Sequence, residues 1–158
     1  DFEIKNVLSK QNAFLMNESL RHVFYRGTAS RFYRMGDHYS GKTGTSNGSR
    51  DNWFCGYSSE EVALVWVGSD ENKKIHRGSG SALALPIWYD YMKNVPKEKN
   101  KKPNPPPKGV VSLRVDPRHG YESKNGIMMW FLKDNLPKKK KNISFKYIKE
   151  GSFRKGLD

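Results

Sequence analysis

The amino-acid sequence predicts an α+β fold in which two helices pack on an antiparallel sheet. Residues 39–68 hold three short segments of strand character joined by turns. Segments with an apolar helical face flank them, at residues 11–26 and 81–95. Only 35% of the 158 residues are hydrophobic, and many of these lie before residue 95. We therefore expect the packed core to belong to residues 1–95.

The first helix is predicted over Gln11–Arg26, because its apolar side chains recur at helical spacing. Ser9 or Asn12 can cap its N-terminus, and Gly27 is a natural C-terminal stop. The second helix is predicted over residues 81–95, with Pro86 tolerated near its start or at a kink. The apolar positions of the first helix are Phe14, Leu15, Leu20, Val23 and Phe24.

The three strands follow one another closely. Residues 39–45 are expected to be extended and to end in a turn at Asn47–Gly48. Residues 52–57 are rich in aromatic side chains, and residues 62–68 form a continuous apolar run, which predicts a strand buried on both faces. Short connections between successive strands predict an antiparallel meander.

Single polar and aromatic residues have mostly structural interpretations. Cys55 is the only cysteine, which excludes an intrachain disulfide, and its mid-strand position predicts a small buried side chain. Trp53, Trp66 and Trp88 are more typical of a core than of a ligand platform. The four histidines are scattered without ligand spacing, so no metal site and no cofactor is predicted.

The most informative segment is Tyr39–Asn47, which reads Y-S-G-K-T-G-T-S-N. A lysine between two glycines, followed by hydroxyl side chains, is typical of anion recognition. Residues 36–43 match the phosphate-loop pattern G-x-x-x-x-G-K-[ST], and Asp70 follows an apolar run as a magnesium-binding aspartate would. A phosphate loop, however, needs a buried strand before it and a helix that starts at the lysine. The charged residues 31–35 and the glycine-rich residues 44–49 supply neither, so a nucleotide hydrolase is a remote alternative.

A second interpretation fits the flanking residues. Gly41–Thr45, Asp51–Tyr57 and Ala63–Gly68 resemble the C-terminal part of the transpeptidase domain of class A penicillin-binding proteins. Leu20–Thr28 is similar to the helix and turn before this strand in the family, and Ala84–Trp88 with Met92 to its C-terminal helix. The resemblance spans about residues 11–94 and implies the C-terminal portion of the serine β-lactamase/D,D-transpeptidase fold.

The resemblance implies a substrate ending in D-Ala-D-Ala, whose carboxylate is held beside the scissile carbonyl. Lys42 supplies charge, the hydroxyls of Thr43 and Thr45 can donate hydrogen bonds, and Gly44 lets a substrate backbone approach. By resemblance, the backbone N–H of Thr45 forms half of an oxyanion hole, and β-lactams would trap the acyl-enzyme. The expected rim of the cleft consists of Ser46, Asn47 and Trp53.

The chain departs from the family because the nucleophile motif S-x-x-K and the second motif S-x-N do not occur in residues 1–41. Residues 152–155 and 123–125 match these motifs in the wrong order, and we assign them no role. We expect the serine on an N-terminal remainder of the domain and no acylation by this chain alone. A start at Asp1, without methionine, suits a fragment or a cleaved product. A non-catalytic, basic cell-wall or membrane-associated binding module is the alternative.

The resemblance also implies a parent protein that acts on peptidoglycan stem peptides. Such a parent works at the extracytoplasmic face of the bacterial cytoplasmic membrane, and its anchor is expected on a segment absent from this chain. These residues contain neither a transmembrane nor a signal segment by composition.

The C-terminal third of the chain differs in composition. Residues 96–108 are rich in proline and lysine and predict a linker, and residues 109–158 form a basic extension. Residues 96–158 carry 17 of the 29 lysines and arginines but only 6 of the 16 acidic residues. The four lysines at 138–141 predict either a solvated segment or attachment to an anionic membrane or wall surface. Nucleic acid is not an expected partner, because no recognition fold accompanies the charge.

Within this extension, residues 109–115 alternate enough to predict one short strand. Asp116–Gly120 is a predicted turn. Residues 127–132 (I-M-M-W-F-L) are an apolar patch that needs a surface to cover it.

Overall fold

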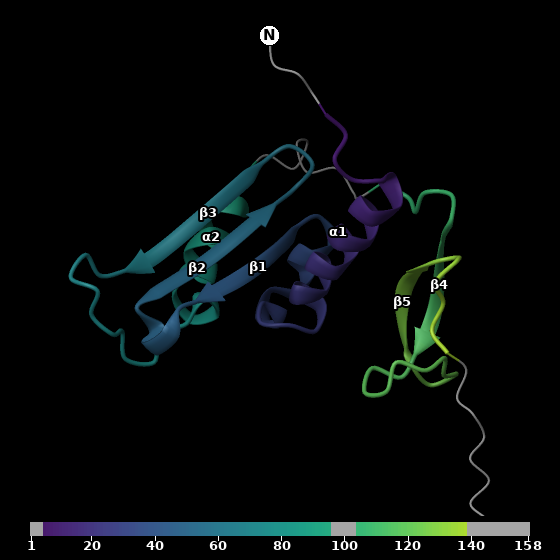
Figure 1. Ribbon diagram of the computed structural model, residues 1–158. Helices are drawn as coiled ribbons and strands as arrows, with labels where there is room; N and C mark the ends of the chain where they lie inside the picture. Colours follow the sequence, from purple (N-terminus) through teal and green to yellow (C-terminus); the bar gives the residue numbers. More distant parts are fainter. Residues whose placement is uncertain (1–4, 96–103, 139–158) are drawn as a thin grey trace, which may run out of the picture.

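The computed structural model describes residues 5–95 and 104–138 and confirms the predicted α+β class (Figure 1). A three-stranded antiparallel sheet has the strand order β1-β2-β3. A separate two-stranded sheet follows near the C-terminus. The helices and strands are α1 (Lys10–Tyr25), β1 (Ser40–Thr45), β2 (Asp51–Tyr57), β3 (Val62–Gly68), α2 (Leu85–Met92), β4 (Val110–Val115) and β5 (Ile127–Leu132).

Helix α1 begins and ends within one residue of the prediction. The Ser9 hydroxyl caps it by accepting a hydrogen bond from the Asn12 N–H at 3.1 Å. A 3₁₀ segment, Ser30–Asp37, follows the helix. The sequence analysis did not predict this segment. It leads the chain from the end of α1 to the start of β1.

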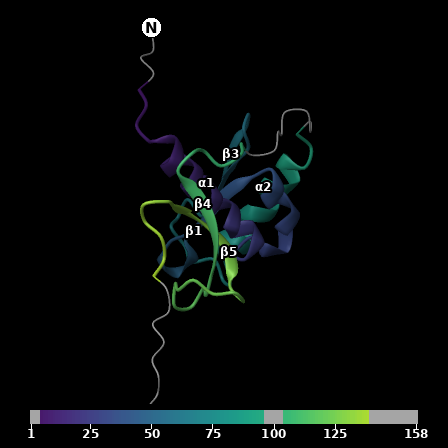
Figure 2. The same ribbon diagram turned by 90° about the vertical axis from the view of Figure 1, so that its right-hand side faces the viewer.

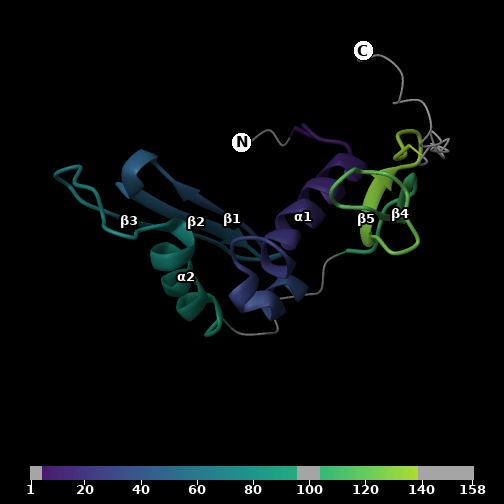
Figure 3. The ribbon, with the colours of Figure 1, turned by 90° about the horizontal axis from the view of Figure 1, so that it is seen from below.

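The core lies between the sheet and helix α2. Phe24 from α1, Phe54 from β2, and Leu85, Trp88 and Met92 from α2 are all fully buried. The Trp88 ring centroid lies 4.9 Å from that of Phe54 and 5.7 Å from that of Phe24. Figure 3 shows α2 under one face of the sheet and α1 beside β1. The core therefore occupies only one side of the sheet.

The prediction that β3 is buried on both faces is wrong for this chain. Leu64 is 60% exposed and Trp66 is 43% exposed, whereas Ala63, Val65 and Val67 are partly buried against the core. A continuous apolar run indicates that both faces of the strand are stabilised by burial, but the described residues bury only one of them. Cys55 of β2, which was expected to be buried, is exposed on the same uncovered side, and Trp53, expected at the cleft rim, lies beside it.

Helix α2 starts later than predicted. The helical run begins with a wide π-helical turn, Gly80–Ala84, and continues as α-helix from Leu85, so Pro86 lies where the π turn gives way to the α-helix. The Ser79 hydroxyl accepts a hydrogen bond from the Ala82 N–H at 3.1 Å. This turn packs against β1 and β2, so it belongs to the surroundings of the lysine strand.

The apolar patch at residues 127–132 is strand β5, which pairs in antiparallel register with β4. The Trp130 ring meets Phe14 of α1 edge to face, with centroids 5.3 Å apart. Figure 2 shows this hairpin in front of α1. Residues 96–103 of the predicted linker, the lysines at 139–141 and the motif at 152–155 lie outside the described residues. Within the described ranges, no helix combines the length and apolar character needed to cross a membrane.

Candidate functional site

The lysine of the K-T-G segment lies near the middle of an edge strand. β1 pairs with β2 on one side only, and Lys42 is exposed. No helix begins at Lys42, because residues 40–45 form one continuous strand. The phosphate-loop interpretation requires a helix N-terminus at this position and is therefore wrong.

Strand register assigns each residue of β1 to a face of the sheet. Lys42 lies opposite Cys55, which lies opposite Leu64; Gly44 lies opposite Trp53, which lies opposite Trp66. Residues directly opposite each other share a face. Lys42 and Gly44 are therefore on the uncovered side of the sheet. We call this side the open face, defined by Lys42, Gly44, Trp53, Cys55, Leu64 and Trp66.

Thr43 and Thr45 point to the other face and have defined partners. The Thr43 hydroxyl lies 2.9 Å from the hydroxyl of Thr28, which follows α1. The Thr45 hydroxyl accepts a hydrogen bond from the Gly80 N–H at 3.0 Å and keeps its own proton for donation. The Lys42 ammonium donates to the carbonyl oxygen of Thr43 at 2.8 Å. These contacts fix the orientation of both hydroxyls on the covered face.

The direction of the Thr45 backbone N–H follows from the hydrogen-bond pattern between β1 and β2. The Ser46 N–H donates to the carbonyl of Asp51 at 2.9 Å, next to the Thr45–Asn52 pair. Hydrogen-bonded and non-hydrogen-bonded pairs alternate along an antiparallel ladder, so Thr45–Asn52 is a non-hydrogen-bonded pair. The Thr45 N–H is therefore directed away from β2, toward the outer edge of the sheet. An oxyanion donor needs this direction.

The three residues expected at the rim surround the end of β1. The Ser46 hydroxyl donates to the Asp51 carboxylate at 3.0 Å and accepts from the Asp51 N–H at 2.8 Å, which fixes the turn. Asn47 begins a short 3₁₀ turn and is exposed. Trp53 packs against Trp66 with ring centroids 6.1 Å apart. The turn and the tryptophan pair therefore lie on either side of the Gly44–Thr45 segment.

Two neighbours of this site were not identified from the sequence as functional. Thr28 gave no motif signal of its own. Gly80 lies directly on the strand backbone, since a methyl group built there would come within 2.3 Å of the Trp53 carbonyl oxygen and 2.6 Å of the Gly44 carbonyl oxygen. The G-S-G run at residues 78–80 is a signal that could have indicated close backbone approach.

The comparisons with known proteins agree with this geometry. The chain is 39% identical over 124 residues to "Penicillin-binding protein 1A" of Pseudomonas aeruginosa, which covers 77% of this chain and 15% of that protein. It is 37% identical over 140 residues to the protein of the same name from Aquifex aeolicus, covering 85% of this chain and 19% of that protein. No model of a known protein family matches the chain.

A solved structure supports the same relationship. The crystal structure of Penicillin-Binding Protein 1A from Haemophilus influenzae matches with a TM-score of 0.68 and 31% sequence identity, over 84% of this chain and 22% of that one. An antiparallel sheet with K-T-G on its edge strand and this overall match define part of a penicillin-binding transpeptidase domain. The chain is therefore a fragment of the transpeptidase domain of a class A penicillin-binding protein. It spans less than a fifth of the length of the two curated relatives.

Proposed function

We propose that this chain supplies the strand that holds the substrate carboxylate and the oxyanion in a peptidoglycan D,D-transpeptidase. One observation carries the proposal: Lys42 and Gly44 lie on a face of the sheet that is apolar and that the described residues leave uncovered. An exposed apolar patch of this kind marks a binding surface. A cationic side chain at the edge of such a patch suits a substrate whose charged end lies beside an apolar wall.

The proposed binding mode uses each residue of the segment. The Lys42 ammonium attracts the terminal carboxylate of a D-Ala-D-Ala peptide, and the hydroxyls of Thr43 and Thr45, on the other face of this edge strand, donate hydrogen bonds around its outer edge. Gly44 has no side chain, so an extended peptide can lie along the outer edge of β1. The Thr45 N–H binds the carbonyl oxygen as negative charge develops on it. One such donor contributes about 3 kcal/mol of transition-state stabilisation.

The proposed reaction is a two-step acyl transfer. A serine oxygen attacks the carbonyl carbon of the penultimate D-Ala, the peptide C–N bond breaks, and terminal D-Ala leaves after its nitrogen takes up the serine proton. An amine of a neighbouring stem peptide then attacks the ester, forms a new amide and returns a proton to the serine. A β-lactam would stop at the first step. Because residues 1–41 hold no S-x-x-K, the serine is assigned to an N-terminal remainder of the domain.

We propose that the N-terminal remainder of the domain packs against the open face. This face presents Trp53, Leu64 and Trp66 beside Lys42, and Trp66 donates a hydrogen bond to Asp51 at 3.2 Å. Covering large apolar side chains of this kind stabilises an interface by roughly 25 cal/mol for each Å² of apolar surface removed from water. A segment seated here would place its serine within reach of a carbonyl held by β1.

Cys55 offers a direct test of this arrangement. The thiol is exposed and lies between Lys42 and Leu64 on the open face. We predict that a thiol reagent modifies Cys55 readily in the isolated chain, and at least about tenfold more slowly once the remainder of the domain is present, because cover removes access. Modification followed by mass spectrometry measures both rates. Equal rates in the two samples would mean that the remainder seats elsewhere.

Labelling by a fluorescent penicillin tests the proposed activity itself. The isolated 158-residue chain is expected to remain unlabelled. A longer protein, in which the segment encoded upstream precedes this chain, is expected to form a covalent adduct on a serine of that segment. Labelling of the isolated chain would contradict the assignment of the serine. If neither form reacts, and no S-x-x-K is encoded about 150 to 250 residues before Lys42, the non-catalytic binding module is favoured instead.

The same proposal extends to the setting of the protein. Peptidoglycan stem peptides and β-lactams are the proposed ligands, and the proposed location is the extracytoplasmic face of the bacterial cytoplasmic membrane. We assign residues 1–95 to the transpeptidase domain, residues 96–108 to a linker and residues 109–158 to a basic extension. The extension is the candidate contact with an anionic membrane or wall surface.

A further inference from the structure

We infer that the C-terminal β4–β5 hairpin positions the lysine strand by bracing the first half of helix α1. The inference rests on the proposed function only in taking β1 as the substrate-binding strand. The contacts between the hairpin, α1 and β1 are contacts between described residues. The link runs from Trp130 to Phe14, then one helical turn along α1 to Asn17, and from Asn17 to the beginning of β1.

The first half of α1 has little apolar anchoring to the sheet. Phe24, near the end of the helix, is its only fully buried residue. Farther toward the N-terminus, a cavity of about 870 Å³ opens between the helix, the β2–β3 turn and the segment before β4, and it is lined in part by Phe14, Glu60 and Pro107. A cavity at this point removes the packing contacts that would otherwise fix the helix. Contacts other than those with the sheet must therefore determine where residues 10–14 lie.

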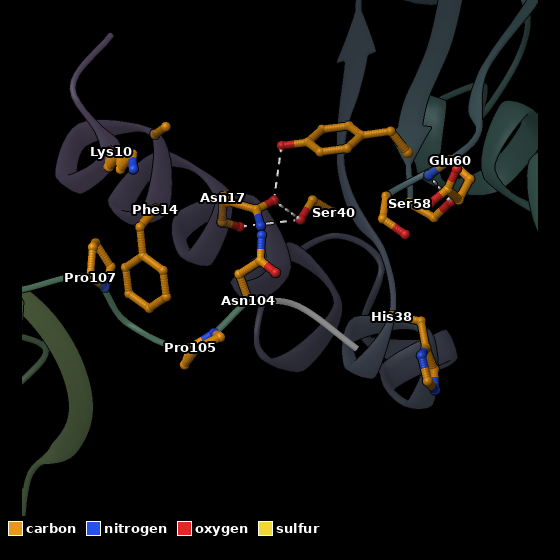
Figure 4. Close-up of a pocket in the computed structure, with 13 residues that line it drawn as sticks. Lys10, Phe14, Asn17, His38, Ser40, Ser58, Glu60, Asn104, Pro105 and Pro107 are labelled. Atoms are coloured by element: carbon orange, nitrogen blue, oxygen red, sulfur yellow. Dashed lines mark hydrogen bonds between the residues drawn. The ribbon is translucent and has the colours of Figure 1, made fainter. Parts of the chain in front are cut away.

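Contacts with the C-terminal segment hold this part of the helix in place. Trp130 of β5 packs edge to face on Phe14, with an interplanar angle of 88°. The Gln11 side chain donates to the carbonyl oxygen of Lys108 at 2.9 Å, just before β4. Figure 4 shows Phe14 beside Pro105 and Pro107, on the segment that leads into β4. A two-stranded hairpin is marginally stable by itself, so these contacts order the hairpin and the helix together.

Asn17 links α1 to the lysine strand β1 by hydrogen bonds. Its side-chain oxygen accepts hydrogen bonds from the Ser40 hydroxyl at 2.5 Å and from the Tyr57 hydroxyl at 3.1 Å. Ser40 is buried and is the first residue of β1, two positions before Lys42. Figure 4 shows Asn17 directed toward Ser40. Burial raises the pKa of Tyr57, so its hydroxyl remains a donor through the neutral pH range.

Hydrogen exchange of the Ser40, Lys42 and Gly44 amides, which face β2 in the antiparallel ladder, tests the brace in the 158-residue chain. Trp130→Ala and Phe14→Ala are each expected to lower the protection of these amides by about three- to tenfold, the range set by the worth of an edge-to-face aromatic pair. The double variant should lose little more than either single variant, because both remove the same contact. Trp130→Phe keeps an aromatic edge and should restore most of the protection. Tyr121→Ala is the matched control, an exposed aromatic residue of the same hairpin that stacks on His119.

A kinetic measurement on the chain joined to its upstream segment separates positioning from general stability. Trp130→Ala is expected to raise the β-lactam concentration that gives half-maximal acylation, with the limiting rate nearly unchanged. Unchanged amide protection in both alanine variants, or an equal loss in Tyr121→Ala, would overturn the brace. If the joined protein does not react with β-lactams at all, the proposed function fails, and hydrogen exchange still decides whether the hairpin positions β1.

Discussion

Lys42→Gln is expected to lower the second-order rate of acylation by a penicillin about 100-fold in the chain joined to its upstream segment. Removing one partner of a close charge pair costs roughly 2 to 5 kcal/mol, and 100-fold corresponds to about 2.7 kcal/mol. Glutamine removes the charge and keeps a hydrogen-bond donor on a slightly shorter side chain. Lys42 is exposed, and its ammonium donates to the carbonyl of Thr43 within its own strand, so folding should change little.

Lys74→Gln is the matched control for this effect. Lys74 lies in the loop after β3, and its side chain passes over Gly48 in the turn that follows β1. The two substitutions change the net charge equally, and both sites are near the end of the lysine strand. The control should keep acylation within about threefold, because surface charges act weakly through solvent. An equal fall in both variants would mean that long-range attraction, not carboxylate binding by Lys42, sets the rate.

Gly80→Ala is expected to destabilise the protein by about 3 kcal/mol and to weaken the site at the same time, since overpacking into a rigid backbone is costly. The new methyl group would lie 2.3 Å from the Trp53 carbonyl oxygen and 2.6 Å from that of Gly44. The Gly80–Ala84 turn would have to move away from β1, which breaks the hydrogen bond from Gly80 to the Thr45 hydroxyl. Urea denaturation followed by tryptophan fluorescence measures the change in stability.

Gly120→Ala provides the comparison. No atom lies within 4 Å of the methyl group that would be added there, so the cost is limited to the left-handed backbone conformation, about 1 to 2 kcal/mol. Gly120→Ala should leave acylation unchanged, because Gly120 lies in the hairpin turn after β4. A Gly80→Ala variant as stable as the parent would show that the turn can move away from the strand at little cost.

Local signals in the sequence were sufficient for the elements around the site. The short segment at residues 39–45, together with the turn residues that follow, predicted a strand ending in a tight turn. Ser9 marked the start of α1, and Pro86 marked the first turn of α2. In each case the determining interaction lies within a few residues of the signal. Such interactions can be predicted from short windows of sequence.

Interactions between distant residues could not be predicted in this way. The apolar run at residues 62–68 indicated two buried faces, but the second face has no cover among the described residues, so Leu64 and Trp66 are exposed. Cys55 was misassigned for the same reason. The bond from Gly80 to Thr45 spans 35 positions in the chain, and the Phe14–Trp130 contact joins the first helix to the last strand. No short window holds both partners of these contacts.

The most direct test compares a penicillin with its carboxylate methyl ester, against the parent protein and the Lys42→Gln variant. If Lys42 acts by holding the carboxylate, the variant should lose about 100-fold with the acid and less than about threefold with the ester, because the ester offers no charge to bind. The parent should likewise acylate far more slowly with the ester than with the acid. An equal loss with both ligands would show that Lys42 acts elsewhere in the reaction and would contradict a carboxylate-binding role for strand β1.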